Sequence, residues 1–195
     1  MPALVLGAGF GTRFRPLTNH VPKPVVPLLG RPLIGHPLIH LYAAGCWEVH
    51  VNAFHQAERL QATLDAWVQR RLLRMRLRWS VEGPDILGTG GALRKLEASL
   101  CRGGPLLMLN GDSVVGADLS ALWAAHQRNR AEGALATLLC VARPDAAAYG
   151  ALRVDGTGRV LDLAGLGRRP GLTDEEVAAA RATIFCGIQV IEPEL

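Results

Sequence analysis

The amino-acid sequence predicts an α/β fold, with a mostly parallel sheet and helices on both of its faces. Short runs of β-branched and aliphatic residues alternate with helical stretches along the 195 residues, which is the pattern of repeated strand and helix units. No internal repeat, charge block or low-complexity linker interrupts the alternation. The length suits about one hydrophobic core, so we expect a single domain over residues 1–195.

The first half of the chain is expected to contribute three strands and two helices. The apolar run at residues 3–6 ends at a glycine and indicates a buried strand. Pro32 suits the first position of a helix that Gly45 ends, because no partner is needed there for an N–H. The predicted strands span 3–6, 48–53 and 75–82, and the predicted helices span 32–44 and 57–71. The second of these helices has the inward residues Leu60, Leu64, Trp67 and Val68.

In the second half of the chain, a second glycine loop in the segment 83–100 leads into a helix. An apolar strand over 105–109 then delivers "NGDS" at its carboxyl end. The segment 149–163 has the alternation and the Gly-rich turn of a hairpin, and Thr173 with Glu176 forms a capping-box pattern ahead of a helix. The remaining predicted elements are a helix over 119–130, a strand over 134–141, the hairpin turn at 155–158 and a strand over 184–191.

The composition indicates a soluble, cytoplasmic protein with reduced cysteines. No apolar run is long enough to span a membrane, and the first residues, "MPALVLG", lack the basic segment and cleavage site of a secretory signal. The four cysteines lie far apart, without a CxxC pair or a histidine at ligand spacing. We therefore interpret them as buried thiols in a reducing compartment: Cys46, Cys101, Cys140 and Cys186.

The basic residues do not indicate a nucleic-acid partner. The formal net charge is only +4, and the densest basic segment alternates Arg74, Arg76 and Arg78 with apolar residues. A period of two fits a strand with one solvated basic face. Binding of a phosphate backbone is the alternative, but no aromatic interleaving or nucleic-acid motif accompanies these arginines.

The segment "GAGFGTRFRPLTNHVPKPVVP" (residues 7–27) begins as a phosphate-binding glycine loop and continues as a proline-rich, cationic one. Its GxGxG spacing is not the dinucleotide fingerprint GxGxxG, no Gly-Lys-Ser/Thr of a P-loop follows, and the prolines exclude a regular helix. The backbone at Gly7, Gly9 and Gly11 is left free to approach phosphates, with Arg13 and Lys23 as cations beside it. A turn with solvated basic residues is the alternative.

Two further segments are expected at the same edge of the sheet. Asp112 follows a buried strand, where it is either a candidate Mg2+ ligand beside phosphates or an Asx turn. Gly88 would let the backbone pass close to a flat base and Thr89 would bond its edge, unless this loop only caps the next helix. Because open α/β sheets bind ligands at the carboxyl ends of their strands, these segments and the glycine loop predict one nucleotide site.

Two other enzyme classes have little support in the sequence. The six histidines are scattered, and none has a serine or cysteine partner at a nucleophile elbow, so no triad hydrolase is expected. An oxidoreductase that uses a dinucleotide is disfavoured by the proline-rich loop.

Together these residues resemble the sugar-1-phosphate nucleotidyltransferases, also called nucleotide-sugar pyrophosphorylases. Similar segments follow one another over essentially the whole chain: "GAGFGTRFRPLT", "PKPVVPLLGRPLI", "LGTGGAL", "LNGD", "YGALRVDGTGRV" and "CGIQVIEPEL". Within the family, the chain is most similar to the mannose-1-phosphate guanylyltransferase-like group, which includes heptose-1-phosphate guanylyltransferases and N-acetylmuramate-1-phosphate uridylyltransferases. The resemblance implies the Rossmann-like nucleotide-diphospho-sugar transferase fold.

The resemblance also implies Mg2+-dependent transfer of a nucleotidyl group from an NTP, with GTP or UTP favoured, to a sugar-1-phosphate, which gives an NDP-sugar and pyrophosphate. The nucleophile is already an anion, so positioning and charge neutralisation are expected to provide the rate. By position in the family motifs, Arg13, Lys23 and Asp112 would be catalytic, with Asp112 as the metal ligand. The nucleotide-binding residues would be Gly7, Ala8, Gly9, Gly11, Thr12, Gly88 and Thr89, and the sugar phosphate would contact Gly150 and Arg169.

Two departures from the family pattern leave an alternative open. After the hairpin, family members often have Glu-Lys-Pro, which contacts the sugar and its phosphate, whereas this chain has "GRRPG". Arg169 retains the cation, but Arg168 cannot accept a hydrogen bond. Family catalytic domains also continue beyond "IEPEL", so we expect a fragment that lacks its C-terminal segment. The alternative is a nucleotide-sugar-binding or regulatory paralogue without turnover, and the oligomeric state is left open.

Overall fold

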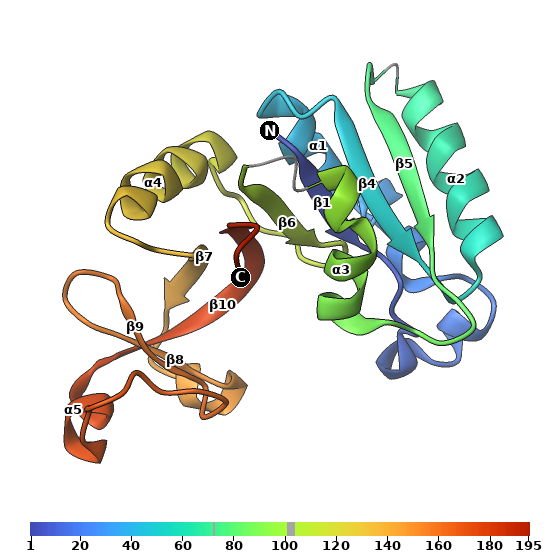
Figure 1. Ribbon diagram of the computed structural model, residues 1–195. Coiled ribbons are helices and arrows are strands. Elements are labelled where there is room, and N and C mark those ends of the chain that lie inside the picture. Colours follow the sequence, from blue (N-terminus) through green and yellow to red (C-terminus); the bar gives the residue numbers. More distant parts are fainter. Residues whose placement is uncertain (72, 101–103) are drawn as a thin grey trace. The chain divides into compact units, whose positions relative to one another are not determined.

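The structure, a computed structural model, describes residues 1–71, 73–100 and 104–195 (Figure 1). These residues form two compact units, and each is described by itself. The first unit contains Met1–Thr137 and Ile188–Leu195, and the second contains Leu138–Gly187.

The sheet of the first unit is mostly parallel, as the sequence predicts. The strands β5, β4, β1 and β6 pair in parallel in that order, and Ile188–Ile191 of β10 adds an antiparallel strand beside β6. In the middle of the sheet, Leu4 lies opposite His50 on one side and Met108 on the other. The strands are β1 (Ala3–Leu6), β4 (Glu48–Ala53), β5 (Arg76–Val81), β6 (Leu106–Asn110) and β10 (Arg181–Ile191).

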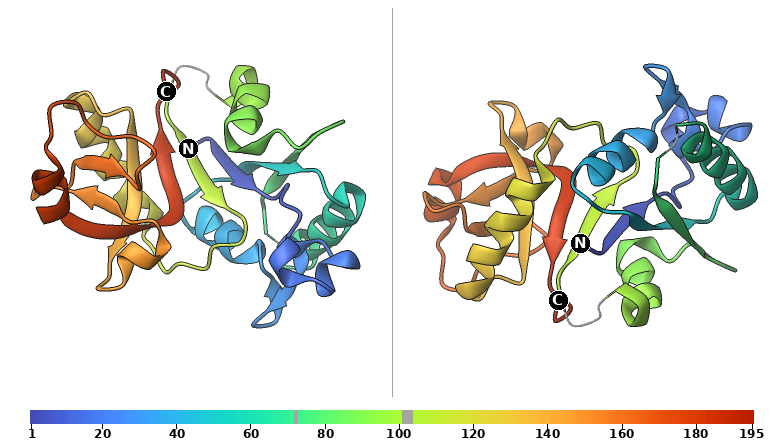
Figure 2. Two further views of the ribbon diagram at one scale, coloured as in Figure 1. Left: turned by 90° about the horizontal axis from the view of Figure 1, so that it is seen from below. Right: turned by 90° about the horizontal axis from the view of Figure 1, so that it is seen from above.

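Helices cover both faces of this sheet (Figure 2). Helices α1 (Gly35–Ala43) and α2 (Ala57–Arg70) lie on one face, and α3 (Gly88–Leu100) lies on the other. The strand order explains this arrangement, because the chain steps from β1 to β4 to β5 in one direction and then returns past β1 to β6. Right-handed crossovers therefore place α3 opposite α1 and α2. Helix α4 (Leu119–Ala131) follows β6.

The two faces have separate clusters of buried apolar side chains. Leu96 of α3 packs in a cluster whose other buried members come from the strands: Leu4, Leu106, Met108 and Ile191. On the α2 side, Leu60 packs with Val25 and Ala53. The predicted inward side of α2 is confirmed for Leu60, Leu64 and Val68, which are buried, whereas Trp67 is only half-buried. Trp67 instead lies against Gly35 of α1, where an added Cβ would come within 2.9 Å of its ring.

The first helix begins three residues later than the sequence predicts. Pro32 does not start it but belongs to a short hairpin, in which β2 (Pro27–Leu28) pairs with β3 (Arg31–Pro32). The turn residues Leu29 and Gly30 both have positive φ, 50° and 75°, which is the requirement of a type I′ turn. The hairpin overrides the preference of proline for a helix start. The end of the helix at Gly45, with φ of 80°, agrees with the prediction.

Most other predicted boundaries differ by no more than two residues, and two differ in a larger way. Helix α3 begins directly at Gly88, so the glycine-rich residues 88–91 form its first turn and not a loop ahead of it. Strand β10 begins at Arg181, three residues before the predicted start. The predicted strands over residues 3–6 and 48–53 have the bounds of β1 and β4.

The second unit is built mainly from antiparallel strands. Within it, β8 (Leu152–Val154) pairs with β9 (Val160–Leu163), and Arg181–Thr183 of β10 pairs with β8. Strand β7 (Ala136–Ala142) pairs with β10. The predicted hairpin turn between β8 and β9 is confirmed, because the carboxylate of Asp155 accepts hydrogen bonds from the N–H groups of Thr157 and Arg159 at 2.8 and 3.0 Å.

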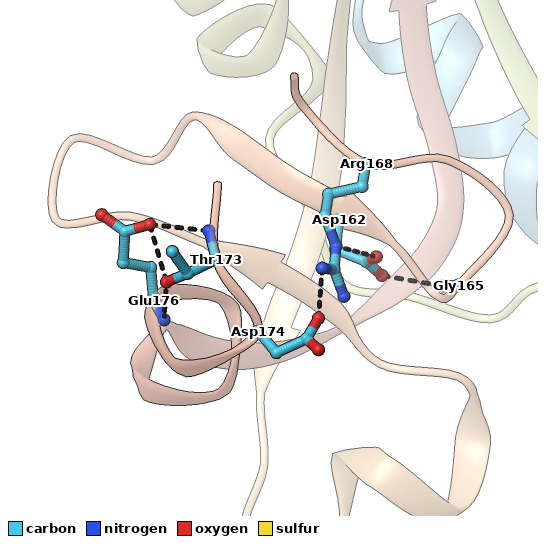
Figure 3. Close-up of polar contacts among 6 residues, drawn as sticks. All are labelled: Asp162, Gly165, Arg168, Thr173, Asp174 and Glu176. Atoms are coloured by element: carbon cyan, nitrogen blue, oxygen red, sulfur yellow. Dashed lines mark hydrogen bonds and ion pairs between the residues drawn. The ribbon is translucent and has the colours of Figure 1, made fainter. Parts of the chain in front are cut away.

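Polar contacts organise the segment between β9 and β10 (Figure 3). The predicted capping box is present at the start of α5 (Asp174–Ala179), where Thr173 Oγ1 accepts from the N–H of Glu176 and Glu176 Oε2 accepts from the N–H of Thr173 at 2.7 Å. Arg168 forms ion pairs with Asp174 and Asp162, and Asp162 also accepts from the N–H of Gly165 at 2.7 Å. The guanidinium of Arg168 is therefore engaged within its own unit.

The cysteine prediction holds only in part. Cys46 is buried, and burial raises the pKa of its thiol. Cys140 and Cys186 are free thiols but only half-buried, so their interpretation as buried residues was wrong, although partial burial still raises the pKa of both. Cys101 lies outside the described residues. In the described part of the chain, no helix has both the length and the hydrophobicity to cross a bilayer.

The basic segment forms the strand at the edge of the first unit's sheet. In β5, Arg76 and Arg78 are exposed and alternate with half-buried Leu77 and Trp79, as the period of two predicts. Both guanidinium groups form ion pairs with Glu48 of the neighbouring strand, with N to O distances of 3.9 and 3.2 Å. This part of the positive charge is therefore balanced by a neighbour in the sheet.

Candidate functional site

A cavity of about 340 Å³ opens in the first unit at the carboxyl ends of β1, β4 and β6. It brings together three segments that the sequence analysis singled out: the glycine loop, the start of α3 and the residues after β6. All ten site residues predicted in these segments line it: Gly7, Ala8, Gly9, Gly11, Thr12, Arg13, Lys23, Gly88, Thr89 and Asp112. Six other residues complete the lining, namely Leu6, Phe14, Pro24, Asn52, Ile86 and Asn110.

The glycine loop has no regular α-helix, as its prolines predict. Three single turns of 3₁₀-helix follow one another at Thr12–Phe14, Leu17–Asn19 and Lys23–Val25. Gly11 reverses the chain with φ of 63° and its carbonyl accepts from Thr18 Oγ1 at 2.9 Å. A Cβ at Gly11 would lie 2.8 Å from Lys23 Cβ, so only glycine fits beside that lysine.

Asp112 reaches the glycine loop because the glycine before it lets two backbones approach closely. The N–H of Gly111 donates to the carbonyl of Leu6 at 2.9 Å, which extends the pairing of β1 with β6 by one bond. A Cβ at Gly111 would lie only 2.6 Å from that carbonyl oxygen. The spacing of "NGD" thus places the carboxylate directly after the last residues of both strands.

An ion pair between Lys23 and Asp112 lies in the cavity. Lys23 Nζ donates to Asp112 Oδ2, and the same ammonium lies 5.2 Å from the centre of the Phe14 ring, within the range of a cation–π contact. The Asp112 side chain is 37% exposed and that of Lys23 is 15% exposed. Both charged groups therefore remain accessible from the cavity. The side chain of Arg13 adds a second, exposed cation to the lining.

A buried polar relay behind the cavity was not anticipated from the sequence. The side chain of Asn52, at the end of β4, accepts from the N–H of Gly7 at 2.7 Å and donates to Glu82 Oε1 at 2.7 Å. Glu82 Oε2 accepts from the N–H of Leu87 at 2.8 Å. The sequence did contain a signal for this relay, because an amide and a carboxylate stand at the ends of two predicted strands, in "EVHVNA" and "WSVEG".

A second polar cluster joins α4 to the end of β10, also within the first unit. His126 is fully buried, and its two ring nitrogens contact Thr137 Oγ1 at 3.0 Å and Glu192 Oε1 at 2.9 Å. Arg130 Nε lies 3.0 Å from the same carboxylate oxygen. This cluster is not part of the cavity lining.

Gly150 and Arg169, predicted to contact the sugar phosphate, lie in the second unit. Gly150 has φ of 74° and ends a short 3₁₀-helix at Ala146–Tyr149. The N–H of Arg169 donates to the carbonyl of Leu161 at 2.9 Å, which leaves its exposed side chain on the hairpin. Arg168, next to it, is held by two acidic side chains. The role of Gly150 and Arg169 in sugar-phosphate binding stays a prediction.

Comparison with known proteins adds an independent line of evidence. Residues 2–164 match the model of the family described as nucleotidyl transferase. UTP–glucose-1-phosphate uridylyltransferase of Synechocystis sp. is 29% identical over 206 residues, which cover 100% of this chain and 50% of the relative. Mannose-1-phosphate guanylyltransferase of Mycobacterium tuberculosis is 34% identical over 159 residues, which cover 82% of this chain and 42% of the relative. The chain thus spans about half the length of these curated relatives, or less.

Solved structures share the fold. HddC from Yersinia pseudotuberculosis, in a complex with GMP-PN, superimposes with a TM-score of 0.72 at 19% identity, over 99% of this chain and 77% of that one. An apo UDP-glucose pyrophosphorylase gives a TM-score of 0.74 at 17% identity, over 100% of this chain and 77% of that one. At these identities the likeness concerns the fold alone.

Proposed function

Because this chain belongs to the nucleotidyl transferase family, we propose that the protein transfers a nucleotidyl group from an NTP to a sugar-1-phosphate. One observation supports this most directly: the glycine loop, two cations and one carboxylate from separate segments line a single cavity. Backbone amides beside cations suit a polyphosphate, and a carboxylate beside both suits the metal that accompanies it. The full activity is proposed for the whole protein, whose curated relatives are about twice as long.

The proposed reaction is an in-line displacement at the α-phosphorus of the NTP. An oxygen of the sugar-1-phosphate forms the new bond to phosphorus, the bond to the β-phosphate oxygen breaks, and pyrophosphate leaves with its electron pair. No proton needs to be removed from the nucleophile, so a general base is not required. In this assignment Arg13 and Lys23 neutralise the phosphates, and the amides of the glycine loop orient them.

Mg2+ fits the carboxylate in the cavity. Mg2+ prefers oxygen ligands and is usually held by one or two carboxylates together with substrate phosphates. Asp112 offers such a carboxylate at the cavity surface, at 37% exposure. When bound, the metal would neutralise phosphate charge. We propose Asp112 as its ligand from this chain.

The ion pair between Lys23 and Asp112 has a simple role in this proposal. Each group neutralises the other, which keeps a lysine that is only 15% exposed from lying beside the cavity without a counter-charge. A bound triphosphate and its metal would offer new partners to both groups, because phosphate oxygens would accept from the ammonium of Lys23 and the carboxylate of Asp112 would hold the metal. The pair therefore holds both side chains near the place where they are needed.

The names of the relatives support a proposal for the base of the NTP and for the sugar. The curated relatives transfer uridylyl and guanylyl groups, as their names state, and one solved neighbour was captured with GMP-PN. We therefore propose GTP or UTP as the nucleotide and a hexose-type sugar-1-phosphate as the acceptor. Gly150 and Arg169 are the proposed contacts to the acceptor. A cytoplasmic location belongs to the same proposal.

Release of pyrophosphate on mixing the protein with NTP, sugar-1-phosphate and Mg2+ tests the proposal. The four common NTPs are paired with glucose, mannose and N-acetylated sugar phosphates, for this chain and for the longest natural version. Pyrophosphate and an NDP-sugar in equal amounts for at least one pair are expected. NTP binding without product for any pair, in both proteins, would instead favour the nucleotide-sugar-binding paralogue, for which the engagement of Arg168 with Asp162 and Asp174 is the supporting observation.

A further inference from the structure

Two segments that line the cavity are connected through two buried side chains. Asn52 is 3% exposed and Glu82 is 5% exposed. Three hydrogen bonds of 2.7, 2.7 and 2.8 Å lead from the N–H of Gly7 through Asn52 and Glu82 to the N–H of Leu87. We call this chain of three bonds the Asn52–Glu82 relay. Its two ends are the first residue of the glycine loop and the residue directly before Gly88 of α3.

The direction of every bond in the relay is determined by the groups at its ends. A backbone N–H can only donate, so Gly7 requires an acceptor from Asn52 and Leu87 requires one from Glu82. The amide of Asn52 must then turn its NH2 group toward Glu82, which as a carboxylate accepts at both oxygens. If the amide of Asn52 were turned over, its NH2 group would face the N–H of Gly7, donor against donor. Its oxygen would face Oε1 of Glu82, acceptor against acceptor. Only one orientation of the Asn52 amide therefore allows all three hydrogen bonds of the relay to form.

The residues at both ends continue directly into the cavity lining. Gly7, Ala8 and Gly9 line it after one end, and Gly88 and Thr89 line it after the other. Glu82 itself is not among the lining residues, whereas Asn52 is. The carboxylate thus lies behind the cavity wall, in contact with both segments. Loss of a hydrogen-bond donor to the buried carboxylate of Glu82 would cost free energy. The relay therefore resists a shift of the glycine loop relative to the start of α3.

We propose that Glu82 and Asn52 are positioning residues that hold the glycine loop and the start of α3 at the spacing required for the NTP. The inference rests on the proposed function, because it takes the cavity to be the nucleotide site. The two side chains act through the backbones of Gly7 and Leu87. Their loss should therefore weaken NTP binding much more than it slows the step at phosphorus.

Reversing the polarity of the relay tests this proposal. Glu82→Gln alone introduces an NH2 group that faces a donor, either the amide of Asn52 or the N–H of Leu87. Asn52→Asp alone places two carboxylates side by side. The double variant Asn52→Asp/Glu82→Gln satisfies every contact again, because the new carboxylate accepts from Gly7 and from the new amide, whose oxygen accepts from Leu87.

The KM for NTP is expected to rise about tenfold or more in each single variant, with kcat and the KM for sugar-1-phosphate within about threefold of wild type. The double variant should return to within about threefold of the wild-type KM for NTP. Glu58→Gln, which neutralises an exposed carboxylate on α2, is the matched control and should change nothing. A double variant as impaired as Glu82→Gln would overturn the proposal, because restoring the hydrogen bonds of the relay would then not restore NTP binding.

Amide hydrogen exchange in the ligand-free protein provides a readout that does not depend on turnover. Both single variants should accelerate exchange at Gly7 and Leu87, and the double variant should restore protection at both. Unchanged exchange at these two amides in Glu82→Gln would contradict the relay. If the wild-type protein bound no NTP, the proposed function would fail, while the exchange data would still show whether the two segments are coupled.

Discussion

The ammonium of Lys23 forms an ion pair with the carboxylate of Asp112, which follows it by 89 positions in the chain. The lysine belongs to a proline-rich loop and the aspartate follows the central strand β6, so only the parallel pairing of β1 with β6 brings them together. Both line the cavity proposed for the nucleotide. The functional predictions below depend on this pairing and on its neighbours.

Removing either member of the pair should abolish most turnover without unfolding the protein. Lys23→Met and Asp112→Asn are each expected to lower kcat by about 100- to 1,000-fold, the usual effect of losing one group that stabilises charge in the transition state. Pyrophosphate release measures this, and thermal unfolding checks the fold. Lys95→Met, at the only other lysine of the sequence, is the matched control. Its exposed ammonium contacts the Val81 carbonyl outside the cavity lining, so wild-type kcat is expected.

Gly11→Ala should damage both stability and nucleotide binding. The substitution forces a Cβ onto a residue with φ of 63°, at 2.8 Å from Lys23 Cβ and 3.0 Å from Thr18 Cγ2. Backbone strain alone costs about 1–2 kcal/mol, and urea unfolding would measure the decrease in the free energy of unfolding. Gly9→Ala is the control for stability, because an added Cβ there meets no atom within 4 Å. Equal stability of the two variants would show that the loop relaxes around Gly11.

Glu192→Ala should destabilise the first unit. The substitution leaves the fully buried ring of His126 without a partner at Nε2 and removes the carboxylate beside Arg130. Loss of a buried hydrogen-bond partner costs about 1–3 kcal/mol. Chemical unfolding should show this decrease for Glu192→Ala and less than about 0.5 kcal/mol for Glu194→Ala, two residues further on and exposed. Unaltered stability in Glu192→Ala would mean that water replaces the carboxylate.

The capping box of α5 should make the second unit sensitive to acid. The backbone N–H of Thr173, and then its hydroxyl, lower the pKa of Glu176 in the folded protein (Figure 3). Because the pKa of Glu176 is lower in the folded than in the unfolded protein, its ionised form stabilises the fold at pH values above the unfolded-state pKa of about 4.3. This stabilisation is lost as the pH falls through the folded-state pKa. Unfolding of this unit should therefore become easier below about pH 4.3.

Thr173→Ala tests the cause of that shift. The variant keeps the backbone N–H and removes the hydroxyl, so the pKa of Glu176 should move part of the way back toward its ordinary value. A titration of the Glu176 carboxyl carbon by NMR measures the change. Thr157→Ala, in the turn between β8 and β9, is the control and should leave the titration of Glu176 as it is. An unchanged pKa in Thr173→Ala would assign the whole shift to the backbone.

Local patterns were sufficient for much of the fold. Strands β1 and β4 have the bounds expected from their apolar runs, and the capping box at Thr173 is present. Where prediction failed, a competing contact was the reason. Pro32 is a good first residue of a helix, but the turn at Leu29 and Gly30 draws it into a hairpin. The depth of Cys140 and Cys186 was also misjudged, because burial depends on what covers a strand.

The order of glycines, cations and carboxylate along the chain, together with the resemblance to the family motifs, was enough to select ten residues that line one cavity. Glycine spacing and strand ends are local properties of the sequence. The partners of buried polar side chains were not accessible in that way. Asn52 faces Glu82, and His126 faces Glu192, only because strand register and helix packing bring together residues 30 and 66 positions apart. Hydrogen bonds act over about 3 Å, so the folded arrangement of the backbone decides which of many polar groups meet.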